Sequence, residues 1–146
     1  MKKQLGFTLI ELMIVVVVAA LLAALAVPAY TAYIARGKIA QVTGALSEAK
    51  VRMEQSFNSV RTYASAPGGL ECAGDLFVPL FSDTAFSVTV SACSDTTFTI
   101  TATGLSGKGM SGYTYTINHA GDKTSTTPAV TTPRNCWLQS KDHTSC

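Results

Sequence analysis

Charged residues are scarce in this chain. They make up 14% of its 146 residues, with 11 Lys and Arg against 9 Asp and Glu, so the formal net charge is +2. This near balance argues against a dedicated polyanion-binding domain, which is usually strongly basic. Hydrophobic residues reach 47%, which excludes a solvated disordered chain. The length is that of a single domain, long enough to bury a core.

Motifs of catalysis and metal binding are also missing. The two histidines, His119 and His143, are accompanied by no nucleophile motif of the type G-x-S-x-G. The Gly and Lys residues of 104–109 lack the spacing of a P-loop, and a hairpin turn explains them better. No two cysteines form a C-x-x-C pair, so a zinc site is not expected. The sequence predicts neither an enzyme nor a cofactor or metal site.

A long apolar run near the start, from Phe7 to Val27, is the most prominent feature that is present. As a helix it would rise about 31 Å, close to the ~30 Å hydrocarbon core of a bilayer. A cleaved secretory signal is the alternative, but its apolar core usually spans about 7–15 residues. Lys2 and Lys3 precede the run, which favours a cytoplasmic N-terminus and places the bulk of the chain outside the inner membrane.

Glu11 is an acidic residue inside this apolar run. Its insertion cost of about 2.5–3.5 kcal/mol is outweighed by the many Leu, Ile, Phe and Val residues, at about 0.3–0.6 kcal/mol each. The run contains no Lys, Arg or His, so a partner for the carboxylate must come from elsewhere. The simplest candidate is an α-amino group, created by cleavage just before Phe7 and supplied by a neighbouring subunit.

The residues around this carboxylate resemble the processing signature of type IV prepilins. Gly6, Phe7 and Glu11 follow a short basic leader of the type IVa kind, and the apolar run continues after them. The resemblance implies cleavage after Gly6 by a prepilin peptidase and N-methylation of Phe7. It also implies assembly through Glu11 with other pilin subunits by the inner-membrane machinery. The precursor would lie in the inner membrane and the product in an extracellular pilus fibre.

The helical pattern continues beyond Pro28, which lies where such pilins often carry a helix-kinking proline. Pro28 removes one helical donor and should bend the helix rather than end it. An apolar stripe then recurs at three- and four-residue spacing: Ile39, Val42, Leu46, Ala49, Met53, Phe57 and Val60. The second half of the helix is therefore expected to be amphipathic and to cover a core, until Pro67-Gly68-Gly69 breaks it.

Three segments alternate apolar and polar residues as half-buried strands do: 86–90, 98–102 and 113–117. A turn before 123–127 allows a short fourth strand, and the Thr- and Pro-rich residues of 118–135 otherwise indicate an exposed loop. The fold class is α+β, a long N-terminal helix packed on an antiparallel β-meander. We expect a leader over 1–6, a membrane and fibre-core helix over 7–30, and a globular head over 31–146.

Four cysteines, Cys72, Cys93, Cys136 and Cys146, allow three disulfide pairings. We favour Cys72–Cys93 and Cys136–Cys146, because both pairs close short loops. Such bonds persist in an oxidising compartment. The second pair also resembles the C-terminal disulfide-bounded loop of type IV pilins.

The resemblance leaves three functions open. The main hypothesis is a structural pilus subunit for adhesion, twitching motility or DNA uptake. The second is a minor pilin acting as a receptor for DNA or a surface. Its candidate phosphate contacts are Lys123, Arg134 and Lys141, with Trp137 for base stacking. The alternative, which we favour for these residues, is scattered solvated charges with Trp137 packed under the C-terminal disulfide loop. The third is a pseudopilin of a type II secretion system, against which the predicted disulfides argue.

Overall fold

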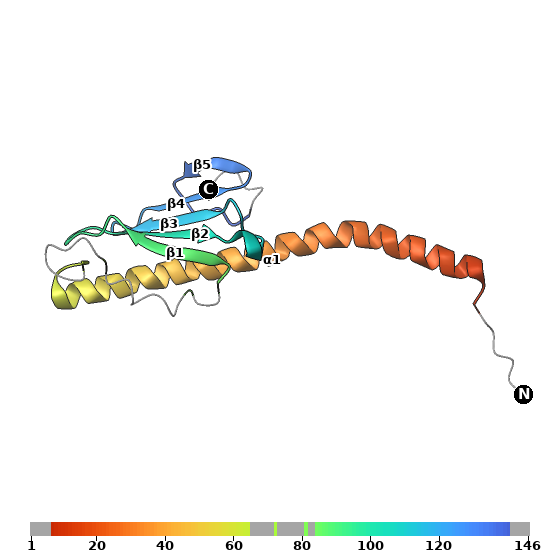
Figure 1. The fold of residues 1–146 in the computed structure, drawn as a ribbon, viewed down its shortest axis with the longest axis horizontal. Helices are drawn as coiled ribbons and strands as arrows, with labels where there is room; N and C mark the ends of the chain where they lie inside the picture. Colours follow the sequence, from red (N-terminus) through yellow and green to blue (C-terminus); the bar gives the residue numbers. More distant parts are fainter. Residues whose placement is uncertain (1–6, 65–71, 73–80, 82–83, 141–146) are drawn as a thin grey trace, which may run out of the picture. The chain divides into compact units, whose positions relative to one another are not determined.

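The computed structural model describes residues 7–64, 72, 81 and 84–140. A long helix, α1 (Leu9–Val60), precedes the strands of the head (Figure 1). The chain divides into two compact units, Met1–Ile34 and Ala35–Cys146, and α1 contributes residues to both of them.

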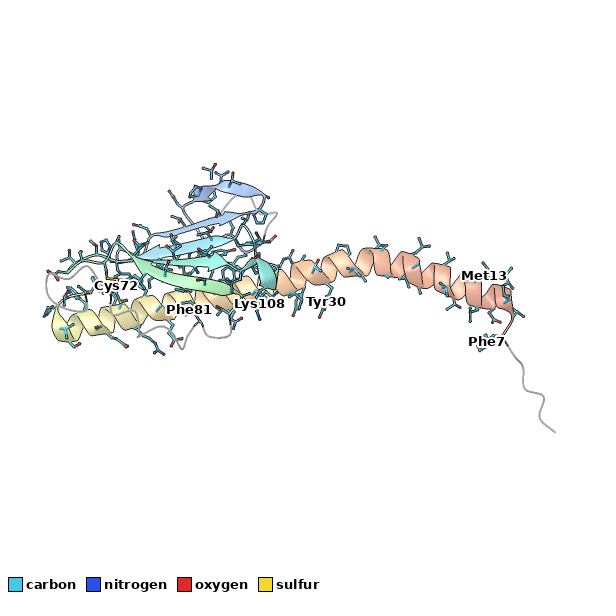
Figure 2. All side chains as sticks on the ribbon, viewed as in Figure 1. Phe7, Met13, Tyr30, Cys72, Phe81 and Lys108 are labelled. Atoms are coloured by element: carbon cyan, nitrogen blue, oxygen red, sulfur yellow. A yellow bond between two sulfur atoms is a disulfide. The ribbon has the colours of Figure 1, made fainter. Side chains whose placement is uncertain are left out.

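In the first unit, every residue from Phe7 to Ile34 is exposed, and the apolar side chains radiate from the helix (Figure 2). Within the described residues, α1 is long and apolar enough to cross a membrane by length and composition, with a mean hydropathy of 2.9 in its most apolar window. The helix continues through Pro28, and the Thr31 hydroxyl donates to the Pro28 carbonyl oxygen at 2.9 Å. A bend at Pro28 stays a prediction.

In the second unit, α1 is amphipathic. Its buried residues are Ile39, Val42, Thr43, Leu46, Ala49 and Met53. The predicted stripe is right through Met53, and Phe57 is half-buried and packs against the same core. Val60 is 58% exposed and was wrongly assigned to the core. The helix ends there because Arg61 adopts a left-handed φ of 61° while its N–H donates to the Phe57 carbonyl. The predicted break, Pro67-Gly68-Gly69, lies outside the described residues.

The described strands of the head are β1 (Phe86–Ser91), β2 (Thr99–Gly104), β3 (Thr114–Asn118), β4 (Lys123–Thr127) and β5 (Val130–Arg134). They form an antiparallel sheet in the order β1-β2-β3-β4-β5, with a 3-10 turn, η2 (Ser106–Lys108), between β2 and β3. The predicted α+β class and the meander are confirmed.

The two faces of this sheet differ in character. The inward face buries apolar residues such as Ile100, Tyr115 and Ile117 in one core with the α1 stripe. The outward face presents hydroxyls in register, with Thr101 of β2 between Thr89 and Thr116. A row of this kind is neutral, and the charged residues of the described strands, Lys123 and Arg134, are the first residue of β4 and the last residue of β5.

The possible fourth strand at 123–127 is present as β4, but the exposed loop predicted for the rest of 118–135 is wrong, because β5 lies in it. In β4, Ser125 and Thr127 are 2% and 1% exposed. The Ser125 hydroxyl donates to the Cys136 carbonyl at 2.6 Å and accepts the Leu138 N–H at 3.0 Å. Hydrogen bonds rather than apolar side chains hold this part of the sheet, which is why a hydropathy pattern did not find β5.

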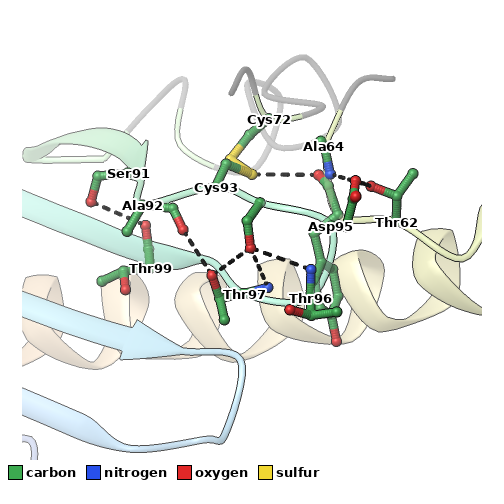
Figure 3. Close-up of a disulfide and its surroundings, with 12 residues drawn as sticks. Thr62, Ala64, Cys72, Ser91, Ala92, Cys93, Asp95, Thr96, Thr97 and Thr99 are labelled. Carbon is green, nitrogen blue, oxygen red and sulfur yellow. Dashed lines mark hydrogen bonds between the residues drawn. A yellow bond between two sulfur atoms is a disulfide. The ribbon is translucent and has the colours of Figure 1, made fainter. Parts of the chain in front are cut away.

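A disulfide joins Cys72 to Cys93, which lies just after β1, with a Cα–Cα distance of 5.5 Å (Figure 3). Beside it, the Thr62 hydroxyl donates to the Asp95 carboxylate at 2.8 Å, and the Tyr63 N–H donates to the Asp95 carbonyl at 3.2 Å. Thr62 and Tyr63, just after α1, are thereby fixed to the β1–β2 turn. Cys136 is also disulfide-bonded, and its predicted partner, Cys146, lies outside the described residues.

Candidate functional site

The first candidate site is the start of α1, around Glu11. The Glu11 N–H donates to the Thr8 hydroxyl at 3.3 Å, and the Leu12 N–H donates to the Thr8 carbonyl at 3.2 Å. Thr8 is therefore the N-cap, and Thr8-Leu9-Ile10-Glu11 has the sequence of a capping box. A negative charge in the first helical turn also interacts favourably with the helix dipole. Glu11 thus lies where a carboxylate favours the start of a helix, which its sequence spacing after Thr8 could have revealed.

The Glu11 side chain is nevertheless available for a partner. It is exposed, and the ion pairs of the described residues, Lys50–Glu54 and Arg52–Glu48, do not include it. Gly6, on the other side of the predicted cleavage site, lies outside the described residues.

The second candidate site is the end of the sheet where β4 begins and β5 ends. Lys123 is the first residue of β4, and Arg134 is the last residue of β5 and lies opposite Ser125. From strand and residue spacings, the Cα atoms of these two cations lie roughly 8 Å apart. Both side chains are exposed. Lys141, the third predicted contact, lies outside the described residues.

Lys123 lies over one face of the Trp137 ring, in line with the alternative that Trp137 packs within the head, and base stacking by Trp137 stays a prediction. The Lys123 Nζ lies 4.4 Å from the Trp137 ring centroid, a cation–π contact. The Trp137 indole N–H donates to the Thr116 carbonyl at 2.8 Å, and the half-buried ring packs against the core. Trp137 therefore orients Lys123 and anchors the segment after β5.

Lys108 and His119 do not join these cations. Lys108 lies in the β2–β3 turn, at the opposite end of β3 from Lys123, and its carbonyl accepts a hydrogen bond from Lys38 Nζ at 2.8 Å. His119 is half-buried in the β3–β4 turn, with its ring edge-to-face on Phe98. The sheet therefore separates Lys108 from Lys123 and Arg134.

An open groove of about 650 Å³ lies beside Lys123. It is lined by Asn118 and Gly121–Thr124 from the β3–β4 hairpin, and by Asn135 and Cys136 after β5. Two hydrogen bonds fix Asp122 in its wall: its carboxylate accepts from Asn118 Nδ2 at 2.9 Å, and its N–H donates to Asn118 Oδ1 at 2.8 Å. This groove was not predicted, because the sequence does not reveal that Asn135 lies near Asn118.

Two protein-family models match the chain. Residues 1–27 match the prokaryotic N-terminal methylation motif, and residues 28–114 match the type IV minor pilin ComP, DNA uptake sequence receptor. The protein is a type IV pilin, a structural and non-enzymatic class. Because the second match covers more than half of its residues, the chain belongs to the family of the type IV minor pilin ComP, DNA uptake sequence receptor.

Curated relatives of the chain include major pilins. It is 42% identical over 62 residues to the type IV major alpha-pilin of Moraxella bovis, which is 42% of this chain and 39% of that one. It is 51% identical over 53 residues to the type IV major fimbrial protein FimA of Dichelobacter nodosus, which is 36% of this chain and 33% of that one. The matches therefore span about two fifths or less of these relatives.

A solved structure shares the fold. The non-core minor pilin PilV of Neisseria meningitidis superimposes with a TM-score of 0.52 at 18% identity, over 66% of this chain and 90% of that one. At this identity the likeness concerns the fold alone. It agrees with the arrangement of a long helix on an antiparallel sheet.

Proposed function

We propose that this chain is a minor pilin that joins an extracellular type IV pilus and binds DNA with its head. The observation that carries the proposal is the match of residues 28–114 to a family described as a DNA uptake sequence receptor. It favours a DNA receptor over the main hypothesis of a bulk fibre subunit. The matched region ends at the first residue of β3, so Lys123 and Arg134 lie beyond it.

The DNA-binding surface we propose is centred on these two cations. They lie at one end of the sheet, are exposed, and take no part in the ion pairs of the described residues. Phosphate contacts by Lys and Arg supply most of the affinity of a protein for DNA. A small number of contacts agrees with the modest net charge of +2. Lys141 is the third proposed contact.

Salt dependence of binding tests this surface. The full chain with Lys123→Ala and Arg134→Ala should bind duplex DNA more weakly at low salt. Each lost phosphate contact reduces the slope of log affinity against log salt by about one. The matched control is Arg36→Ala with Lys108→Ala, which removes the same two residue types elsewhere in the head. Equal slopes in both double variants would reject the surface, and no binding by the parent chain would reject the receptor function.

The proposed route to the fibre follows the prepilin signature. Prepilin peptidase cuts after Gly6, Phe7 is N-methylated, and Glu11 pairs with the new amine of a neighbouring subunit. The match of residues 1–27 to the methylation motif supports this sequence of events. A bulky substitution of Gly6 should leave uncut precursor in the membrane, detected by intact mass, whereas normal processing would count against the cleavage site.

A major pilin is the second candidate, because curated relatives that match the chain are major pilins. The abundance of the chain in fibres separates the two roles. Fibres sheared from cells and analysed by intact mass should contain this chain as a scarce component that begins at methylated Phe7. If it is instead the dominant component, the chain is the bulk fibre subunit.

A further inference from the structure

Asp122 is an acidic residue within the proposed DNA-binding surface. It directly precedes Lys123, is exposed, and lines the groove at this end of the sheet. It takes no part in the two ion pairs of the described residues. A carboxylate beside phosphate-binding cations repels the DNA backbone, so it should weaken binding to DNA of any sequence.

The geometry holds this carboxylate in a defined orientation. Asn118 Nδ2 donates to Asp122 Oδ2, and the Asp122 N–H donates to Asn118 Oδ1. The Asp122 carbonyl in turn accepts the Asn118 N–H. Asn118 is in turn the last residue of β3, where it pairs with Thr99 of β2. The turn is therefore built on the sheet, and the carboxylate keeps further acceptor positions for a ligand, since it can accept about four hydrogen bonds.

Base edges offer such a carboxylate a specific partner. Phosphate contacts position a protein on DNA, whereas contacts to base edges read the sequence. Cytosine presents its N4 amine as a donor in the major groove, and Asp and Glu accept from it. Adenine presents its N6 amine as a donor beside N7, which is an acceptor. N7 would then face the second carboxylate oxygen, and two acceptors repel each other.

We propose that Asp122 is a specificity-determining residue that accepts a hydrogen bond from the amine of a cytosine, while Lys123 and Arg134 hold the neighbouring phosphates. This inference rests on the proposed DNA-binding function. Asp122 repels a duplex that offers it no amine and binds one that does. Specificity for the cytosine-containing duplex therefore comes from an attractive and a repulsive contact together.

Selection from a randomised duplex pool by the full chain tests this role. The parent should enrich sites with cytosine at one position, by roughly five-fold or more over the other bases. Asp122→Asn should move the preference at that position toward adenine, because an amide offers both an acceptor and a donor. Asp122→Ala should abolish the preference and bind random duplex about two- to five-fold tighter at low salt.

Two features of the design separate the outcomes. Asp122→Asn is nearly isosteric and keeps an acceptor for Asn118. A changed preference in this variant therefore cannot be ascribed to a misfolded turn. Glu48→Gln removes the same charge from α1 and should change neither the preference nor the random affinity. A parent that binds duplexes without any cytosine preference, or a preference that both Asp122 variants keep, overturns the reading role and leaves DNA binding standing. If the parent chain binds no duplex from the pool, the proposed DNA-binding function is overturned as well.

Discussion

At the scale of single residues, the turn between β2 and β3 depends on Gly104. A Cβ added to this glycine would lie well inside van der Waals contact with the carbonyl oxygen of Met110. Met110 is fully buried and its N–H donates to the Leu105 carbonyl, so it has little room to move. The sequence marks 104–109 as a turn, but which glycine is indispensable follows only from this close approach.

Gly104→Ala is therefore expected to lower the free energy of unfolding by about 1–3 kcal/mol, as overpacking in a core does. Gly107→Ala is the matched control, because a Cβ there meets nothing within 4 Å. Urea unfolding of the full chain in detergent, followed by Trp137 fluorescence, measures both. Equal midpoints for the two variants would contradict the packing argument.

Tyr63 is one residue whose titration makes the stability of the fold fall at alkaline pH. Burial, together with the hydrogen bond to Glu54 and the negative charge of Glu54, raises the pKa of Tyr63 to about 12. The hydroxyl donates to Glu54 Oε2 at 3.0 Å, and the ring stacks on Phe57. Since the pKa is higher in the folded chain than the ordinary value of 10.0, this stabilisation is complete below pH 10 and is lost as the pH rises toward 12.

Tyr63→Phe keeps the ring and removes the hydroxyl. The variant should be less stable than the parent by about 1 kcal/mol at neutral pH. The difference should shrink above pH 10, because only the parent loses the contribution of this phenol. Tyr115, whose pKa burial also raises, is common to both chains and cancels. A difference that stays constant from pH 8 to 11 in urea unfolding would refute the assignment.

At the scale of elements, the helix and the first strands were predictable because apolar side chains decide them. The period from Ile39 to Met53 marks the buried stripe, and the alternation in β1 marks its inward face. By contrast, β5 has one buried residue, Val130, and its neighbour β4 is held by the hydroxyl of Ser125. Because its other four residues are exposed, β5 has the composition of a loop and the residue pattern missed it, whereas the turn before 123–127 had allowed β4 as a short fourth strand.

The Cys72–Cys93 disulfide connects the segment after α1 to the β1–β2 turn. It closes a loop with a sequence separation of 21 residues, so it should contribute about 3 kcal/mol in the loop-entropy account. Replacing both cysteines by Ser should lower the unfolding free energy by about this amount. Adding a reductant to the parent should lower its melting temperature as well, and an unchanged melting temperature would contradict a structural role for the bond.

At the scale of the whole molecule, the apolar residues of the first unit need partners that the chain itself does not supply. Large side chains such as Phe7 and Leu9 are 85% and 77% exposed. Each would gain about 1.5–3 kcal/mol on full burial. Lipid before assembly and like helices afterwards are the surroundings that the prepilin signature implies. The sequence predicted this run well, because a continuous apolar segment needs no tertiary information.

An assembly assay separates the two roles that we propose for Glu11, capping the helix and pairing with a neighbouring subunit. Glu11→Gln keeps a side chain suited to the capping box and removes the charge, so it should insert in the membrane but yield few fibres, as should Glu11→Val. Thr8→Ala removes the N-cap hydroxyl and keeps the charge, and it should cost about 1 kcal/mol of helix stability while fibres still form. Fibre yield after shearing is the measurement. Normal yield from Glu11→Gln with loss in Thr8→Ala would assign Glu11 to capping alone.

The order β1-β2-β3-β4-β5 also has a kinetic consequence. Each described strand pairs with its neighbour in the sequence, so the chain segments that must close to form the sheet are short. Short closures have a small entropic barrier, and a low contact order goes with fast folding. Docking of the α1 stripe onto the sheet joins residues much farther apart in the sequence. We therefore expect the strands to pair with one another first and the α1 stripe to dock onto the sheet in a slower step.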